Sequence, residues 1–558
     1  MIAALLKVTD LTVVHDGDGG ERTLLDAVSL DLAPGEVLGL VGESGSGKSL
    51  LCRSLVRLLP SSRLRISGGS ITLSGRELTT APEAEMLAVR GGEIGMIFQN
   101  PSSHLDPVMK IGDQITEGIR FHQRLDAKAA RAAAVDILAQ VGFPDPARQY
   151  DSYPHEFSGG MRQRAMIGAA LSSNPRILIA DEPTTALDVT IQAQILRLLM
   201  DIRARRGLSV ILVTHDLGIV AQVCDRIAVM WQGRLVEIGE KRGLLAAPAH
   251  AYTRSLIASH PSLPEEDMPA KAEKLRAPGA VPVVDIEKLH VRFATGGLFR
   301  RGAVDAVNGV TLRVMPGETV GIVGESGSGK STLARAVLGL TPVSSGTIRF
   351  DGADIASGRA VLGMLRRQTA MVFQDPYNAL NPHLTVGKML AEVLRVQGKI
   401  ETAQIPARCG ELLDLVGLGR AFLDRKPRSM SGGQCQRAGI ARALAVDPKL
   451  IIADECVAAL DVTIQAQIVE LFRELVERMS LTLLFIAHDL AIVRNLCQRV
   501  VVMHRGVVVE EGRSEEVFSR PKHAYTAALI AAVPHIDPDK PLLAPSKMAT
   551  PQADGVAN

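Results

Sequence analysis

A nine-residue segment, VGESGSGKS, occurs twice in this chain, at Val41–Ser49 and again at Val323–Ser331. Both copies contain the P-loop pattern, in which a glycine is followed after four residues by Gly-Lys-Ser. Glycines allow successive backbone N–H groups to converge on a polyphosphate, and the helix that follows offers its positive N-terminal end. The lysine of such a loop reaches the outer phosphates, and the serine hydroxyl can ligate Mg²⁺. Two intact copies therefore predict two nucleotide-binding units.

Internal repetition extends far beyond these two loops. The interval from His215 to His488 also separates the serines of two SGG tripeptides and the aspartates of two ADE tripeptides. The interval between the P-loop lysines, Lys48 and Lys330, is slightly longer. The second half is therefore shorter in one region and keeps its register afterwards, which predicts two domains of one fold.

Each half contains short apolar strands that alternate with segments typical of helices. The strands Val37–Val41 and Thr319–Val323 run into the P-loops. Later apolar strands are expected to end at Asp181 and Asp454, and further ones at His215 and His488. A middle region rich in Ala, Leu, Arg and Glu indicates helices. We therefore expect an α/β fold with a mainly parallel sheet, whose ligands lie at the carboxyl ends of the strands.

The length of 558 residues exceeds the size of about 250–300 residues at which single hydrophobic cores stop growing. A segment crowded with Pro, Glu, Lys and Ala separates the two halves, and the C-terminal end is again rich in proline. The predicted organisation is a first domain at 1–258, a linker at 259–282, a second domain at 283–534 and a flexible C-terminal tail at 535–558.

Composition excludes several classes of protein. The 62 basic and 60 acidic side chains give a net charge of +2, which removes the bulk electrostatic argument for nucleic-acid binding. Six scattered cysteines without a CxxC pair predict buried thiols rather than a zinc site or a disulfide framework. We expect no signal peptide, and no apolar run reaches the roughly 18–20 residues of a membrane span.

Further motifs appear in the same order in both halves. They are MIFQNP and MVFQDP around Gln99 and Gln374, FSGGMRQR and MSGGQCQR from Phe157 and Met430, LIADEPTTALD and IIADECVAALD from Leu178 and Ile451, and the histidines His215 and His488. With the two P-loops, these motifs resemble the Q-loop, signature, Walker B, D-loop and switch histidine of ABC-type ATPases. The resemblance implies two tandem P-loop NTPase domains, each with a mainly parallel sheet core, an antiparallel β subdomain and a helical subdomain.

The resemblance also implies a role for each motif. Glu182 and Glu455 are expected to polarise or deprotonate the attacking water, and His215 and His488 to hold the γ-phosphate and steady that water. The expected Mg²⁺ ligands, direct or through water, are Ser49, Gln99, Asp181, Ser331, Gln374 and Asp454. The SGG turn of each half is expected to close on the nucleotide of the other half. The expected ATP-binding residues are Gly42, Glu43, Ser44, Gly45, Ser46, Gly47, Lys48, Ser49, Ser158, Gly159, Gly160, Phe293, Gly324, Glu325, Ser326, Gly327, Ser328, Gly329, Lys330, Ser331, Thr332, Ser431, Gly432 and Gly433.

The chain departs from the family pattern at a few positions. Met161 replaces the final glutamine of the commonest signature sequence, LSGGQ. Phe293 is expected to stack on adenine in the second half, whereas His15 occupies the matching place in the first. Cys456 stands where the family commonly has proline or a small residue, and we expect it to serve in packing.

Other segments point to a branch of the family. NPSSHLDPVMKIGDQI and DPYNALNPHLTVGKML follow the two Q-loop glutamines, and a HAYT tetrapeptide follows each core. These segments resemble ATPase subunits of dipeptide, oligopeptide and nickel importers, in which an HPYT-like motif occurs, with Ala251 and Ala524 here in place of the proline. With two ATPases fused in one chain, this protein resembles the ATPase subunits of glutathione and microcin-C-type peptide importers.

This branch implies two integral-membrane permease subunits and an extracytoplasmic solute-binding protein as partners. The chain would then be a peripheral protein on the cytoplasmic face of the inner membrane, without direct contact with the solute. Peptide is the expected solute, and glutathione, an opine-like conjugate and nickel remain open.

Two alternatives have less support in the sequence. Twin-ABC proteins that act on ribosomes carry a long basic helical linker, which 259–282 is not, and DNA-repair relatives carry CxxC pairs. An ABC exporter ATPase would leave the HAYT segments unexplained. We therefore expect no nucleic-acid partner.

Overall fold

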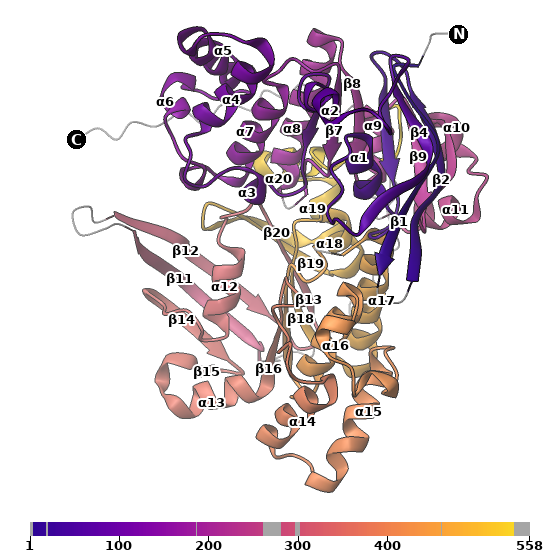
Figure 1. Ribbon diagram of the computed structural model, residues 1–558. Coiled ribbons are helices and arrows are strands. Elements are labelled where there is room, and N and C mark those ends of the chain that lie inside the picture. The colour runs from indigo at the N-terminus through magenta and orange to yellow at the C-terminus, as the bar shows by residue number, and fades with distance from the viewer. Residues whose placement is uncertain are drawn as a thin grey trace, which may run out of the picture. The chain divides into compact units, whose positions relative to one another are not determined.

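The computed structural model describes residues 4–17, 20–185, 187–260, 281–295, 302–458 and 460–540 (Figure 1). The chain folds into two compact units. The first comprises Met1–His260 together with Pro534–Asn558, and the second comprises Pro261–Val533. Most of the predicted linker, residues 261–280, lies outside the described residues. Within the described part of the chain, no helix is long and apolar enough to cross a membrane.

The first unit contains an antiparallel sheet and a mainly parallel sheet. The antiparallel sheet has the order β2-β1-β4-β5, with β1 at Leu6–Gly17, β2 at Gly20–Leu32, β4 at Leu64–Leu73 and β5 at Arg76–Glu77. The second sheet has the order β10-β9-β3-β8-β7-β6, with β3 at Val37–Val41, β6 at Ile94–Ile97, β7 at Ile177–Asp181, β8 at Ser209–Val213, β9 at Arg226–Trp231 and β10 at Arg234–Glu240. All its neighbouring strands are parallel except β10, which pairs antiparallel with β9.

Burial explains why short apolar runs become strands here. Every residue of β3, β7 and β8 is buried, as expected for parallel strands that are covered on both faces. The apolar residues of these strands divide between two hydrophobic clusters, one shared with the antiparallel sheet and one shared with the helices that follow β6.

The helices of the first unit follow in sequence order. They are α1 at Lys48–Leu55, α2 at Glu83–Val89, α3 at Pro101–His104, α4 at Ile111–Gln123, α5 at Ala127–Gln140, α6 at Pro146–Tyr150, α7 at Gly159–Leu171, α8 at Val189–Arg206, α9 at Leu217–Val223, α10 at Lys241–Ala246 and α11 at Ala251–Ala258, with a 3₁₀ turn at Pro154–Glu156. In Figure 1, α4, α5 and α6 form a group of their own, apart from the sheet of β1, β2 and β4. The expected antiparallel and helical subdomains are therefore confirmed in this unit.

The second unit repeats both sheets. The antiparallel sheet has the order β12-β11-β14-β15, with β11 at Val284–Thr295, β12 at Gly302–Val314, β14 at Ser345–Phe350 and β15 at Ala353–Asp354. The mainly parallel sheet has the order β16-β17-β18-β13-β19-β20, with β13 at Thr319–Val323, β16 at Thr369–Val372, β17 at Leu450–Asp454, β18 at Thr482–Ile486, β19 at Arg499–His504 and β20 at Val507–Arg513. Read from the opposite edge, this is the strand order of the first unit, which confirms the repeated α/β fold.

Helices in the second unit match those of the first, except that short turns replace α3 and α6. They are α12 at Lys330–Val337, α13 at Arg359–Gln368, α14 at Val386–Gln397, α15 at Ile405–Leu415, α16 at Gly432–Leu444, α17 at Val462–Met479, α18 at Leu490–Leu496, α19 at Ser514–Ser519 and α20 at Ala524–Ala531. The 3₁₀ turns are Ile355–Ser357, Thr402–Gln404, Arg420–Phe422 and Pro427–Ser429.

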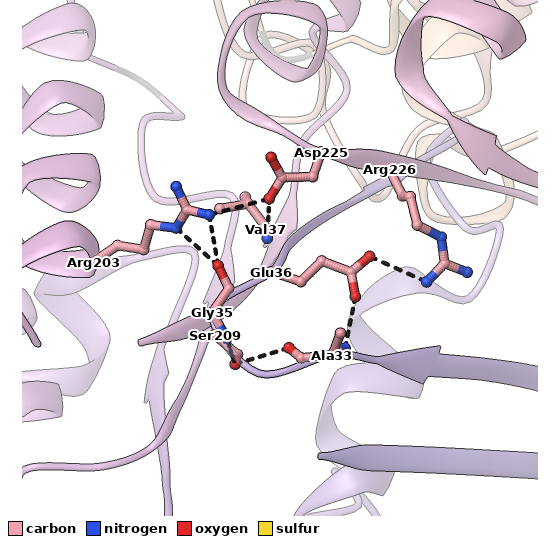
Figure 2. A network of polar contacts seen from close by, with 8 residues as sticks. All are labelled: Ala33, Gly35, Glu36, Val37, Arg203, Ser209, Asp225 and Arg226. Carbon is pink, nitrogen blue, oxygen red and sulfur yellow. Dashed lines mark hydrogen bonds and ion pairs between the residues drawn. The ribbon is translucent and has the colours of Figure 1, made fainter. Parts of the chain in front are cut away.

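Polar side chains hold the amino end of β3 in place (Figure 2). The buried Glu36 carboxylate accepts a hydrogen bond of 2.6 Å from the Ala33 amide and lies 3.1 Å from the Arg226 guanidinium. Asp225 accepts a hydrogen bond of 2.9 Å from the amide of Val37, the first residue of the strand. Because buried backbone groups need partners, these carboxylates stabilise the turn before β3.

Arg203 of α8 joins the same network. Its guanidinium donates to the Gly35 carbonyl at 2.6 Å and to Asp225 at 3.2 Å. The Ser209 hydroxyl accepts from the Gly35 amide at 2.8 Å and donates to the Ala33 carbonyl at 3.0 Å. The start of β3 is therefore tied to α8 and β8, so the P-loop at the other end follows a strand in a defined position.

The C-terminal segment from Pro534 packs against the first unit. Pro534 lies beside Gly218 in α9, and Ile536 packs on the hydrophobic cluster that the parallel sheet shares with the helices after β6. Asp539 pairs with Arg242 of α10 at 2.5 and 2.9 Å. The sequence predicts a flexible tail from residue 535, but apolar and charged contacts hold residues 535–540 here instead. Residues 541–558 lie outside the described part of the chain.

Candidate nucleotide-binding sites

The predicted site residues of the first unit meet at one edge of the parallel sheet. The P-loop follows β3, Gln99 follows β6 by two residues, and Asp181 is the last residue of β7. His215 lies two residues beyond β8, which ends at Val213 rather than running to the histidine. Since the carboxyl ends of parallel strands share one edge, four segments far apart in sequence meet there.

The first glycine of the P-loop leaves no room for a side chain. Gly42 has φ 149°, and a Cβ atom there would lie 2.2 Å from the carbonyl oxygen of Met230 in β9. Gly324 repeats this geometry, with φ 146° and a Cβ position 2.1 Å from the Met503 carbonyl oxygen. The loop can therefore lie against the neighbouring strand only with glycine at this position.

The P-loop lysine is held by the backbone of its own loop. Lys48 Nζ donates to the carbonyls of Gly42 at 2.7 Å and Glu43 at 2.8 Å, and the side chain is buried. Helix α1 begins at Lys48, with Gly47 as N-cap and no acidic side chain in its first turn. A buried ammonium group beside a positive helix end suits the binding of a polyphosphate.

Ser49 and Asp181 form a pair behind the loop. The Ser49 hydroxyl donates to Asp181 Oδ1 at 2.9 Å, and Ser331 donates to Asp454 Oδ1 at the same distance. Burial raises the pKa of both aspartates in spite of these hydrogen bonds. A hydroxyl and a carboxylate are hard oxygen ligands of the kind that Mg²⁺ prefers. Among the described residues, no group of three or more His, Cys, Asp or Glu side chains is arranged to hold a metal without further ligands.

Glu182 is the centre of a second polar cluster. The Gln99 amide donates to Glu182 Oε2 at 2.7 Å, and the Thr185 hydroxyl donates to the same oxygen at 2.8 Å. Glu182 has φ 49°, a left-handed backbone conformation that is uncommon for a residue other than glycine. His215 Nδ1 lies 3.8 Å from Glu182 Oε1.

The charges of this cluster shift one another's pKa. Burial alone would raise the pKa of Glu182, but His215 and Thr185 bring it down to about 2. Burial alone would lower the pKa of His215, but the Glu182 carboxylate raises it above the ordinary histidine value. Glu182 is therefore an anion over the whole physiological pH range, and His215 is held closer to its charged form.

The second unit repeats the cluster with one difference. Gln374 donates to Glu455 Oε2 at 2.8 Å, and His488 Nδ1 lies 3.9 Å from that oxygen. Glu455 also has a left-handed backbone, with φ 47°. Ala458 occupies the place of Thr185, so this position supplies no hydroxyl to the second glutamate.

The SGG turns begin a long helix in each unit. Ser158 is the N-cap of α7 and accepts from the Met161 amide, and Ser431 is the N-cap of α16 and accepts from the Gln434 amide. Gln434 also accepts from the Ser431 amide at 3.0 Å, which completes a capping box. Met161 has no oxygen with which to do so. The two signature helices therefore start with different hydrogen bonding.

Phe293, the residue expected to stack on adenine, and His15, at the matching place in the first unit, both lie in the antiparallel sheets. Phe293 of β11 is 44% exposed and pairs in register with Val304, which is 53% exposed. His15 of β1 pairs with Arg22 in the matching position. The two units thus present different surfaces at this position, one apolar and one polar.

Packing accounts for all six cysteines. Each is free and buried, as the sequence predicts. Burial raises the pKa of the Cys456 thiol far above its ordinary value, which leaves it a neutral packing group.

Two groups of residues lie beside the site although the sequence patterns do not predict them there. Thr185 lies in the segment after Glu182. The one sequence feature that could have drawn attention to it is that the repeat has Ala458 at the same place. The tyrosines of the HAYT segments, Tyr252 and Tyr525, approach the P-loops in space. The sequence feature that could have drawn attention to these tyrosines is that they recur at the same interval as His215 and His488.

Comparisons with known proteins agree with this architecture. The ABC transporter family model matches residues 25–185 and 307–458, and the model "Oligopeptide/dipeptide transporter, C-terminal region" matches residues 236–287 and 509–556. The peptidoglycan transport ATP-binding protein YejF of Agrobacterium fabrum is 44% identical over 539 residues, which cover 96% of this chain and 97% of that protein. The glutathione import ATP-binding protein GsiA of Salmonella choleraesuis is 44% identical over 563 residues, which cover 96% and 90%.

Two P-loops at the carboxyl edges of two parallel sheets, with paired acids and histidines beside them, define an ATPase built from two ATP-binding cassettes. The chain belongs to the ABC transporter family, within its oligopeptide/dipeptide branch.

Proposed function

We propose that this chain binds and hydrolyses ATP to power the import of a peptide through a membrane ABC transporter. The observation that carries the proposal is the match to the oligopeptide/dipeptide transporter C-terminal region, which follows both cassettes. Relatives named for the import of glutathione and the transport of peptidoglycan support a peptide-like solute.

Each cassette has a complete set of reacting groups for hydrolysis. In the first, Lys48 holds the outer phosphates, Glu182 polarises the attacking water, and His215 holds the γ-phosphate. Lys330, Glu455 and His488 do the same in the second cassette. The hydrogen bonds from Gln99 and Gln374 to the two glutamates support a role for the glutamines in reporting the state of the site.

Mg²⁺ fits the oxygen donors behind each P-loop. Ser49, Asp181 and Gln99 would hold it in the first cassette, and Ser331, Asp454 and Gln374 in the second, directly or through water. Bound there, the ion would neutralise charge on the phosphates. The buried carboxylates Asp181 and Asp454, each bonded to a serine hydroxyl, support this assignment.

In the proposed cycle, ATP binding brings the two cassettes together, and hydrolysis separates them. The SGG turns, Ser158–Gly160 and Ser431–Gly433, then each serve the nucleotide of the other cassette. Their place at helix N-termini suits them to a phosphate, because unpaired amides and the positive helix end face the same way.

A groove beside the first Q-loop suits a permease segment. It has a volume of about 510 Å³, and its lining includes Phe98, His104 and Gln114. Phe98 precedes Gln99 and stacks on His104 with ring centroids 4.1 Å apart. Two exposed apolar side chains are close in sequence to these lining residues, Val108 in the turn before α4 and Phe121 in α4. An apolar cytoplasmic helix of a permease subunit would bury these side chains, and a movement of Gln99 would then displace that helix.

The partners of this proposal are two integral-membrane permease subunits and an extracytoplasmic solute-binding protein. The chain would sit as a peripheral protein on the cytoplasmic face of the inner membrane. Purification of the complex in detergent tests this directly, because permease subunits should accompany the chain. Co-purification with ribosomes or DNA would favour the alternative of a soluble twin-cassette factor.

The catalytic assignment has its own test. Glu182→Gln combined with Glu455→Gln should abolish steady-state hydrolysis while preserving ATP binding, and should trap an ATP-loaded form. ATP turnover at the wild-type rate in the double variant would refute the roles of both glutamates. Identifying the solute carried by the partner receptor would distinguish peptide from glutathione, an opine-like conjugate or nickel.

A further inference from the structure

The HAYT segment of each cassette contacts the P-loop. The phenol oxygen of Tyr252, in α11, accepts a hydrogen bond of 2.9 Å from the backbone N–H of Glu43. In the second cassette, Tyr525 of α20 accepts one of 3.0 Å from the N–H of Glu325. The partners are 209 and 200 residues apart in the chain. The same long-range contact is therefore built twice.

This contact acts on the peptide that anchors the P-loop lysine. The Gly42–Glu43 peptide donates its N–H to Tyr252, while its carbonyl accepts from Lys48 Nζ at 2.7 Å. A trans peptide is planar and its N–H and C=O point in opposite directions, so the tyrosine and the lysine hold one plane from two sides. If that plane rotated, Lys48 would lose one of its two carbonyl partners, the one at 2.7 Å.

The second cassette has the same arrangement. The Gly324 carbonyl accepts from Lys330 Nζ at 2.7 Å, and the N–H of the same peptide is the one bound by Tyr525. Gly42 and Gly324 have φ of 149° and 146°, a conformation in which glycine itself resists rotation very little. The hydrogen bond to the tyrosine therefore adds a restraint that the glycine itself does not supply.

Stacking on a second aromatic ring fixes the orientation of each tyrosine ring. Tyr252 stacks on Trp231 of β9, with ring centroids 5.5 Å apart and planes 22° apart. Tyr525 stacks on His504 of β19, at 4.1 Å and 19°. Because each stacking partner ends the strand next to the P-loop strand, the phenol oxygen is directed at the loop.

A set of hydrogen bonds common to both cassettes positions the helix that carries each tyrosine. In the first cassette, the Glu237 carboxylate accepts from the amides of Ala249 at 2.7 Å and His250 at 3.1 Å. His250 Nδ1 then accepts from the Tyr252 amide at 3.2 Å, which caps α11. These bonds fix where α11 starts and therefore where Tyr252 points.

The second cassette has the same contacts around α20. Glu510 accepts from the amides of Lys522 at 2.8 Å and His523 at 3.0 Å, and His523 Nδ1 accepts from the Tyr525 amide at 3.1 Å. Burial would raise the pKa of both carboxylates, but the bonded amides and a threonine hydroxyl keep it below the ordinary value, with Thr526 beside Glu510 and Thr253 beside Glu237. Both carboxylates are therefore charged and strong acceptors.

We propose that Tyr252 and Tyr525 are positioning residues for ATP binding, which hold the P-loop lysine in place through the Gly-Glu peptide. They act through Lys48 and Lys330 and not on the nucleotide itself. The inference rests on the proposed function of the P-loops, and it gives the HAYT segment a role inside the cassette.

The test is the double variant Tyr252→Phe with Tyr525→Phe, measured in the full chain. It removes two hydroxyls and keeps both rings on their stacking partners. Loss of one neutral hydrogen bond per loop is expected to raise the KM for ATP by about two- to tenfold. The turnover number should fall by a smaller factor, because the reacting groups stay in place. The rise in Tm produced by a fixed concentration of MgATP should also shrink.

Tyr150→Phe is the matched control. The Tyr150 hydroxyl is buried and bonds to Thr116 at 3.0 Å and to Asp113 at 3.1 Å, within the helical region and away from the P-loop. It should lower Tm while leaving the KM for ATP unchanged. A double tyrosine variant with lowered Tm but wild-type KM and wild-type ATP-induced Tm rise would overturn the proposal. If the unmodified chain shows no ATP-induced rise in Tm, the proposed function itself fails instead.

Discussion

Thr185 donates a hydrogen bond of 2.8 Å to Glu182 Oε2, the same oxygen that accepts from Gln99. Ala458 stands in its place in the second cassette, where Glu455 Oε2 accepts from Gln374. The two glutamates proposed to polarise water therefore have different donors around them, although both P-loops are identical in sequence.

A reciprocal exchange tests what this difference does. A donor holds the carboxylate in one orientation, and a neutral hydrogen bond contributes about 0.5–1.5 kcal/mol. With the other cassette silenced by Glu455→Gln, Thr185→Ala should lower the turnover number by about two- to tenfold. With Glu182→Gln as background, Ala458→Thr should raise the turnover number. Equal turnover numbers within each pair of chains would show that the hydroxyl has no influence.

The first glycine of each P-loop should tolerate no side chain. Gly42→Ala places a Cβ atom 2.2 Å from the Met230 carbonyl oxygen, so the loop must leave its place and ATP binding by the first cassette should be lost. Gly207→Ala is the control, because a Cβ there meets no atom within 4 Å and costs only the strain of its φ of +63°, about 1 kcal/mol. Isothermal titration with ATP should separate the two variants. Equal ATP affinity in both would contradict the clash.

The signature helices offer a second exchange. Gln434 completes a capping box at the start of α16, whereas Met161 leaves the Ser158 amide of α7 without that partner side chain. Met161→Gln should stabilise the first unit by about 0.5–1 kcal/mol, and Gln434→Met should destabilise the second by a similar amount. Urea unfolding, with the transition of each unit followed separately, measures the change in the free energy of unfolding in each variant. Changes of the same sign in the two variants would rule out the capping explanation.

His215 should titrate above an ordinary histidine because Glu182 stabilises its charged form, which raises the pKa of His215. The stability from this pair is fully present below the unfolded histidine pKa and is lost as pH rises through the raised folded value. Glu182→Gln removes the negative partner and should lower the His215 pKa. NMR titration of histidine ring resonances measures the shift, and the other histidines serve as internal references. A pKa that is unchanged in the variant would mean that the approach of His215 to Glu182, at 3.8 Å, carries no coupling.

The network at the start of β3 should matter for stability. Glu36→Ala leaves the Ala33 amide and part of the Arg226 guanidinium without their buried acceptor, at a cost of about 1–3 kcal/mol. Arg234→Ala removes an exposed ion pair with Asp26 and should cost less than about 1 kcal/mol. Thermal melts of the two variants compare these effects. The prediction fails if the exposed pair costs as much as the buried one.

Much of the fold is predictable from the pattern of residues along the chain. The strands Val37–Val41 and Thr319–Val323 have the predicted bounds, because an apolar run before a glycine loop allows few other structures. The pattern predicts the strand before His215 two residues too long, since Thr214 is as buried as the strand but lies beyond the last ladder pair. Prolines predict a flexible tail from residue 535, whereas Ile536 and Asp539 find partners that only the folded unit supplies.

Order and spacing along the chain are enough to establish two cassettes, the positions of their loops, and the acids and histidines that stand at the strand ends. A linear pattern records such features completely. The folded chain was needed to show that Tyr252 meets Glu43 across 209 residues, and that Thr185 shares an oxygen of Glu182 with Gln99. Such contacts depend on which surfaces pack together after the sheet forms, and no local spacing rule encodes that packing.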